Sequence, residues 1–162
     1  MRDYPITAYY DRKPGTVDGL FTLQSFDENG NIVKLFSRLP ARSGQQSYCD
    51  TDWVRGQSPI PAGRHFLWLT PVNPGTWPKM PGGIGEFYPI SSGLMNRRLI
   101  MAEDTGKVRM DIGLHPENGY RGSAGCIVLL HDTPARKAEV ARLFAFLRTL
   151  GKSQETIDLV VL

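Results

Sequence analysis

Glycine and proline are the feature that most limits what this chain can fold into. The 162 residues include 17 glycines and 12 prolines, which is a high content for a helical bundle and favours a turn-rich, mainly β protein. Hydrophobic residues make up 41% of the chain and charged residues 22%, so a packed core is expected and disorder is not.

Short β-prone runs separated by turn residues fill the first 130 positions. The clearest is a hairpin over residues 20–36, because Asn29-Gly30 lies between two apolar runs. Alternation in the first run directs Phe21 and Leu23 towards a core, with Phe26 as a further candidate. The other candidate strands are residues 7–10, 64–69, 86–90, 98–101, 108–114 and 127–130.

The C-terminal region has a different pattern. Thr133 and Pro134 are typical of a helix N-cap and first position, and Gly151 is a stop signal. Between them one apolar face is formed by Val140, Leu143, Phe144 and Leu147. Residues 157–162 predict a closing strand. Since no repeat or linker interrupts the chain, we expect one domain over residues 1–162, of mainly β (α+β) class.

Charge and hydropathy exclude several classes of function. The formal net charge of +3 and the isoelectric point near 9.0 are too weak to indicate nucleic-acid binding, although they suit an anionic partner such as a wall polymer. No apolar stretch is long enough to predict a membrane span, and residues 1–5 lack the apolar region of a signal peptide. We therefore expect a monomer made in the cytoplasm.

The segment with the strongest chemical signal is residues 112–130. His115 ends a predicted strand, a glycine-rich loop follows, and Cys126 begins the next strand. A nearby imidazole can take the proton of a thiol and hold a thiolate–imidazolium pair. Gly125 permits close approach of a substrate carbonyl, and the backbone amides of Gly125 and Cys126 are candidate donors to an oxyanion.

These residues resemble the catalytic motif of the L,D-transpeptidase (YkuD-type) family, in which a histidine precedes Ser-x-Gly-Cys. Here His115 precedes Ser123-Ala124-Gly125-Cys126. Two upstream stretches, residues 41–44 and 58–65, resemble the family's further signature. The resemblance is closest to the small type VI secretion L,D-transpeptidase effectors and covers residues 41–130.

The resemblance implies a β-sandwich of the YkuD type with its catalytic pair on adjacent strands. It implies that Cys126 is the nucleophile, that His115 is the base and that Ser123 orients the histidine or substrate. The implied reaction forms a thioester at the bond between the diamino acid and D-Ala of a peptidoglycan stem peptide. Water would then give L,D-carboxypeptidase activity and an amine would give transpeptidation. No cofactor is implied.

Departures from the motif, including Pro116 after the histidine, favour a short and hydrolytic relative. Such a protein is an antibacterial effector acting in the periplasm, with an immunity protein as partner, or a phage protein. Two alternatives stay open. In the first, the same fold cuts another peptidoglycan bond, as an endopeptidase or glycan hydrolase. In the second, the chain is a non-catalytic wall-binding or virion module.

Other residues have weaker signals. Arg121 is a candidate for binding a substrate carboxylate, and Trp77 and Tyr88 are candidates for lining a groove, whereas Phe87 fits a core position better. The three histidines lack the spacing of a metal site, so no metal is expected. Cys49 lacks the local signature of a papain-like nucleophile, and a disulfide to Cys126 is not needed in a chain of this length.

Overall fold

A computed structural model describes residues 5–13, 15–44, 59–72, 86–101, 106, 108–117 and 125–162. Within these residues the chain forms ten strands and one helix. In chain order they are β1 (Thr7–Arg12), β2 (Asp18–Phe26), β3 (Ile32–Arg42), β4 (Gly63–Trp68), β5 (Tyr88–Ser91), β6 (Leu99–Met101), β7 (Val108–Met110), β8 (Gly113–Pro116), β9 (Ile127–Leu129), α1 (Pro134–Leu150) and β10 (Thr156–Val161). The mainly β class with one C-terminal helix and a final strand is confirmed.

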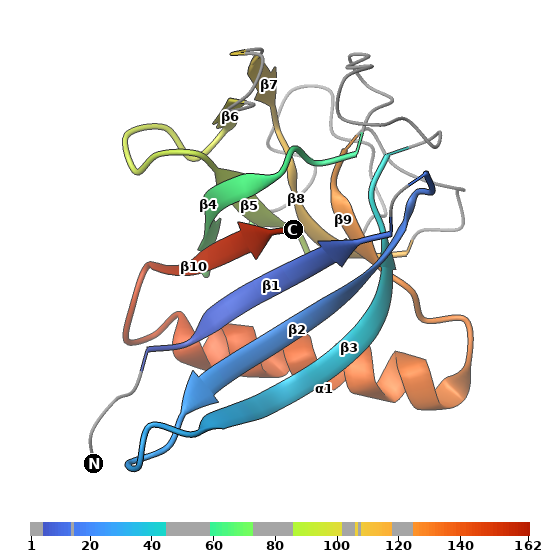
Figure 1. Cartoon of the computed structure of the whole chain (residues 1–162), viewed down its shortest axis with the longest axis vertical. Helices are drawn as coiled ribbons and strands as arrows, with labels where there is room; N and C mark the ends of the chain where they lie inside the picture. The colour runs from blue at the N-terminus through green and yellow to red at the C-terminus, as the bar shows by residue number, and fades with distance from the viewer. Residues whose placement is uncertain are drawn as a thin grey trace.

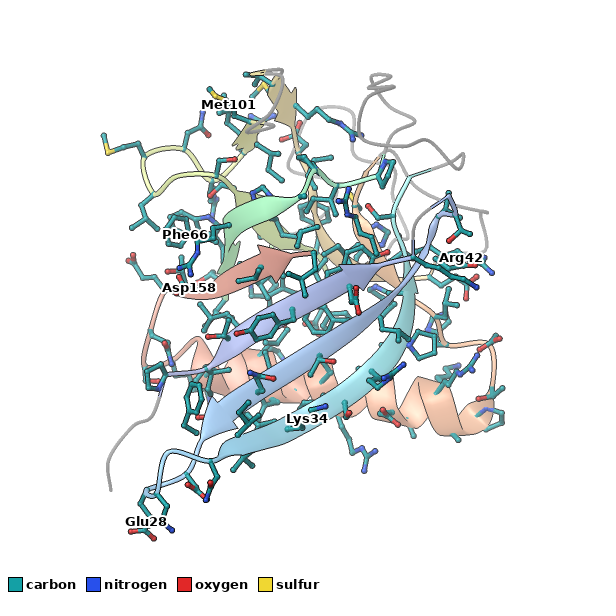
Figure 2. The ribbon with its side chains drawn as sticks, in the orientation of Figure 1. Glu28, Lys34, Arg42, Phe66, Met101 and Asp158 are labelled. Atoms are coloured by element: carbon teal, nitrogen blue, oxygen red, sulfur yellow. The ribbon has the colours of Figure 1, made fainter. Side chains whose placement is uncertain are left out.

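Eight strands close into a mixed barrel in the order β1-β10-β4-β5-β8-β9-β3-β2 (Figure 1). The sheet is therefore closed, and its relation to the YkuD-type sandwich that the resemblance implies stays a prediction. The long strand β3 explains the closure, because it pairs with β2 along its length and with β9 at its C-terminal end. Figure 2 shows its reach, with Glu28 at the tip of the hairpin before it and Arg42 at its far end.

The predicted hairpin is formed by β2 and β3. Asp27 accepts hydrogen bonds from the backbone of Asn29 and Asn31, and Gly30 takes the positive φ of 79° that the turn requires. Phe21 is fully buried, but Phe26 is 38% exposed, so its expected core position is wrong. Phe26 is an odd number of residues from Phe21 and therefore points to the opposite face of the strand.

The C-terminal helix has the predicted boundaries. The Thr133 side chain accepts a hydrogen bond from the backbone N–H of Arg136 at 3.2 Å, and Gly151 caps the other end. All four residues of the predicted apolar face are buried in the main core. Two ring contacts fix the position of α1 against the barrel, namely Phe36 with Phe146 and Tyr88 with Phe144.

The predicted strand over residues 108–114 is divided into β7 and β8. The division falls at Asp111, whose φ of 60° is incompatible with continuous extended backbone. Strand β7 leaves the barrel to pair with β6 in a separate two-stranded ribbon, while β8 enters the barrel between β5 and β9. Asp111 therefore redirects the chain just before the strand that contains His115.

Candidate active site

His115 in β8 and Cys126, which directly precedes β9, are placed on the same side of the sheet by the strand register. Strands β8 and β9 are parallel, with His115 opposite Val128, and Cys126 is two residues before Val128. Side chains two residues apart on a strand share a face. The cross-strand neighbour of Cys126 is then Gly113, and His115 is its diagonal neighbour, which is within reach of a long side chain. Phe87 lies beside both predicted residues, since it clusters with Cys126 and stacks on the ring of His115.

His115 is buried and held in one tautomer. Its Nδ1 lies 2.8 Å from the carbonyl oxygen of Pro116, which can only accept, so Nδ1 donates and Nε2 keeps its lone pair. The ring stacks on Phe87, with ring centres 6.0 Å apart. Burial lowers the pKa of His115, with a smaller opposing effect of the Pro116 carbonyl. The imidazole is therefore neutral at pH 7 and suited to accept a proton at Nε2.

Cys126 is a buried thiol, and Cys49 lies outside the described residues. Burial raises the pKa of the Cys126 thiol to about 11, with a smaller raising effect of Asp111. The backbone N–H groups of Gly113 and Cys126 and the charge of Arg109 oppose this rise in pKa. The thiol is protonated at neutral pH, so the site favours proton transfer during reaction over the preformed thiolate–imidazolium pair that the sequence suggested.

The hydroxyl of Ser43 holds the backbone of the segment before the nucleophile. The carbonyl oxygen of Gly125 accepts a hydrogen bond of 2.9 Å from the hydroxyl of Ser43, and the same hydroxyl accepts one of 2.7 Å from the backbone N–H of Ile60. Ser43 is fully buried. One side chain therefore joins residues 41–44, residues 59–63 and the nucleophile segment, which are the three stretches in which the sequence resembles the family.

Sequence reasoning missed two residues next to the thiol. Arg109 is buried in β7, and Asp111 directs its carbonyl oxygen at the Cys126 sulfur, 3.9 Å away. The Asp111 carboxylate accepts two hydrogen bonds from Arg98, of 2.7 and 3.0 Å. Neither residue belongs to a recognisable motif. The one feature of the sequence that could have drawn attention to Arg109 is its charge, since it lies between the apolar residues Val108 and Met110 in a β-prone run.

The remaining site predictions have different outcomes. Tyr88 is fully buried, stacks on Phe144 and donates a hydrogen bond to Glu86, so its ring offers no surface to a substrate. Phe87, which directly precedes β5, is buried in the small cluster with Cys126. Ser123, Arg121 and Trp77 lie outside the described residues, and their roles stay predictions. The oxyanion role of the Gly125 and Cys126 amides also stays a prediction.

Metal ligands do not gather in the part of the chain that the structure describes, where no group of three His, Cys, Asp or Glu side chains could hold an ion. Within that part His65 bonds the carbonyl oxygen of Pro61 through Nε2 at 2.9 Å. No helix among the described residues is long and apolar enough to span a membrane. Comparison with models of protein families, with curated proteins and with solved structures finds no match.

Proposed function

We propose that this protein is a cysteine-dependent peptidoglycan enzyme of the L,D-transpeptidase type, with Cys126 as nucleophile and His115 as general base. The observation that carries the proposal is the position of His115 in β8 and of Cys126 just before β9 on one face of the sheet, with the Nε2 lone pair of His115 kept available. The motif resemblance supports it, and we propose on the same basis that the barrel is a variant of the YkuD-type sandwich.

The proposed reaction begins when Nε2 of His115 takes the proton of the Cys126 thiol. The thiolate attacks the carbonyl carbon of the bond between the diamino acid and D-Ala in a stem tetrapeptide. The carbon–nitrogen bond breaks, the departing amine takes the proton from the imidazolium, and a thioester remains on Cys126. Water or an amine then attacks the thioester carbonyl, the carbon–sulfur bond breaks, and the proton lost by the attacking group returns through His115 to the Cys126 sulfur. Water gives the shortened peptide, and an amine gives a cross-link or an exchanged residue.

The biological setting follows from the same resemblance. We propose an antibacterial effector or phage protein that acts on the wall in the periplasm, with an immunity protein as the partner of an effector. The mildly basic charge of the chain is compatible with binding to anionic wall polymers.

The test is incubation of the protein with purified disaccharide-tetrapeptide, followed by mass spectrometry. We expect the wild type and a Cys49→Ala control to remove one D-Ala, and Cys126→Ala and His115→Ala to leave the tetrapeptide intact. Added D-amino acid appearing in the product would show exchange as well. An intact tetrapeptide with the wild type contradicts the substrate assignment, and cross-linked dimers and glycan strands are then the substrates to test.

A non-catalytic wall-binding module is the second candidate. The observation that favours it is the burial of both His115 and Cys126, which also suits a structural cysteine. Sedimentation with purified wall sacculi separates the two candidates when combined with the tetrapeptide assay. A binding module co-sediments equally well as wild type and as Cys126→Ala, and neither protein changes the peptide.

A further inference from the structure

Arg109 is a buried charged residue whose position needs a physical reason. It lies in the middle of β7 and is 5% exposed, whereas its neighbours Val108 and Met110 are about half exposed. Strand alternation therefore turns the charged side chain inward and the two apolar side chains outward. Burial of a charge is costly unless other groups compensate it, so this inverted arrangement points to a role for the guanidinium inside the molecule.

The guanidinium of Arg109 packs directly on the nucleophile segment. A Cβ atom built on Gly125 would overlap its Cζ and both terminal nitrogens, so only glycine leaves room for it. Gly125 also has a φ of 114°, a conformation that L side chains rarely adopt. On its other side Nη1 of Arg109 lies 3.5 Å from the carbonyl oxygen of Pro59. Arg109 thus contacts the residue before Cys126 and the segment that Ser43 also holds.

Three charged or titratable residues lie on the elements around the thiol. The charges of Arg109 in β7 and of Asp111 in the connection to β8 affect the pKa of the thiol, and His115 in β8 lies on the same face of the sheet. The paired hydrogen bonds from Arg98 offset the charge of Asp111. The charge of Arg109 lowers the pKa of Cys126, whereas the pKa of His115 is set by burial and by Pro116. Arg109 therefore favours a negative sulfur.

We propose that Arg109 is a positioning residue of this site, which fixes the backbone of Gly125 and stabilises the thiolate that forms when His115 accepts the proton of Cys126. The inference rests on the proposed function, since it assigns a role in activating the nucleophile. It also implies that Gly125 is glycine in order to admit the guanidinium as well as to adopt its backbone angle.

The experiment measures the rate of iodoacetamide labelling of Cys126 at fixed pH between 7 and 9, by intact mass, in a Cys49→Ala background. Arg109→Gln removes the charge and Arg109→Lys keeps it. Loss of a nearby cation raises a thiol pKa by roughly one to three units, and the greater nucleophilicity of a more basic thiolate offsets part of the lost rate. We expect Arg109→Gln to slow labelling at least about threefold, and Arg109→Lys to label at close to the wild-type rate.

A purely structural role predicts the opposite sign, because loosening of the site exposes the thiol and accelerates labelling. Faster or unchanged labelling of folded Arg109→Gln would therefore overturn the inference. If that variant does not fold by circular dichroism, Arg109→Met replaces it. If neither neutral variant folds while Arg109→Lys does, Arg109 is a folding residue and the inference is also overturned.

The labelling assay and the peptide assay together distinguish failure of the role of Arg109 from failure of the proposed function. A wild type that trims the tetrapeptide, combined with unchanged labelling in Arg109→Gln, removes the role of Arg109 and keeps the enzyme. A wild type that neither trims the peptide nor labels at Cys126 without urea removes both, and identifies Cys126 as a buried structural residue.

Discussion

Gly125→Ala is the substitution for which the structure gives the sharpest expectation. Two independent costs arise at this position, a backbone cost from the φ of 114° and a steric cost from the overlap of the new methyl group with the guanidinium of Arg109. The backbone cost is about 1–3 kcal/mol, and overpacking of a filled interior costs about 1–3 kcal/mol more. We therefore expect the free energy of unfolding to fall by roughly 2–6 kcal/mol.

Gly30→Ala is the matched control. Gly30 also has a positive φ, of 79°, but a Cβ atom there meets nothing within 4 Å. Its substitution carries the backbone cost alone, about 1–2 kcal/mol. Urea unfolding of both variants, followed by circular dichroism, measures the difference. Equal losses in the two variants would refute the contact between Arg109 and residue 125.

A double-mutant cycle isolates the steric part of the cost. Arg109→Ala removes the guanidinium and leaves space for the methyl group, so Gly125→Ala should cost less in that background than in the wild type. We expect a favourable coupling of about 1–3 kcal/mol, which is the overpacking cost that disappears. Strict additivity of the two changes would show that residues 109 and 125 do not touch in solution.

Four further predictions concern the site and the helix. Ser43→Ala leaves two buried backbone groups without their partner and should lower the free energy of unfolding by about 2–4 kcal/mol in urea titrations, with loss of peptide trimming. Because burial lowers the pKa of His115 below its ordinary 6.5, the folded protein should lose stability as pH falls below 6.5, and His115→Gln should reduce that loss. Because burial raises the pKa of Cys126 from 9.0 to about 11, stability should also decline as pH rises through that window, and Cys126→Ser should flatten the decline in thermal melts. Thr133→Ala removes the helix N-cap and should cost about 0.5–2 kcal/mol by urea unfolding, without changing the labelling rate of Cys126.

Local signals in the sequence predicted the local elements of the fold. Asn29-Gly30 identified the hairpin, and Thr133 and Gly151 identified the ends of the helix, because turn and cap chemistry depends on adjacent residues. Closure of the barrel could not be predicted in this way. It depends on the pairing of β3 with β9 and of β1 with β10, which joins residues more than 80 positions apart.

The candidate site was predicted only where a motif exists. His115 and Cys126 belong to a recognisable string, and the register of β8 and β9 places them on one face. Arg109 has no motif, and the pattern rule for a strand beside solvent would turn it outward, since its two neighbours are apolar. Its inward position depends on the bend at Asp111 and on the space that Gly125 leaves, which only the folded chain defines.

Departures from local rules concentrate around one sulfur atom. Arg109 is charged and buried, Asp111 has a φ of 60°, and Gly125 has a φ of 114°. Arg38, the other described non-glycine residue with positive φ, lies where the pairing of β2 and β3 is irregular, and its amide bonds the Thr22 side chain.

A structural cysteine would need none of these departures, because the apolar side chains of Val72, Phe87 and Val128 already enclose Cys126. Sequences that otherwise agree with their fold tend to break local rules where chemistry requires it. The residues that break them here are Arg109, which is buried and charged, Asp111, whose carbonyl oxygen points at the thiol, and Gly125. Gly125 leaves room for the guanidinium and adopts a positive φ. Their convergence on Cys126 therefore favours a reactive thiol over a packing residue.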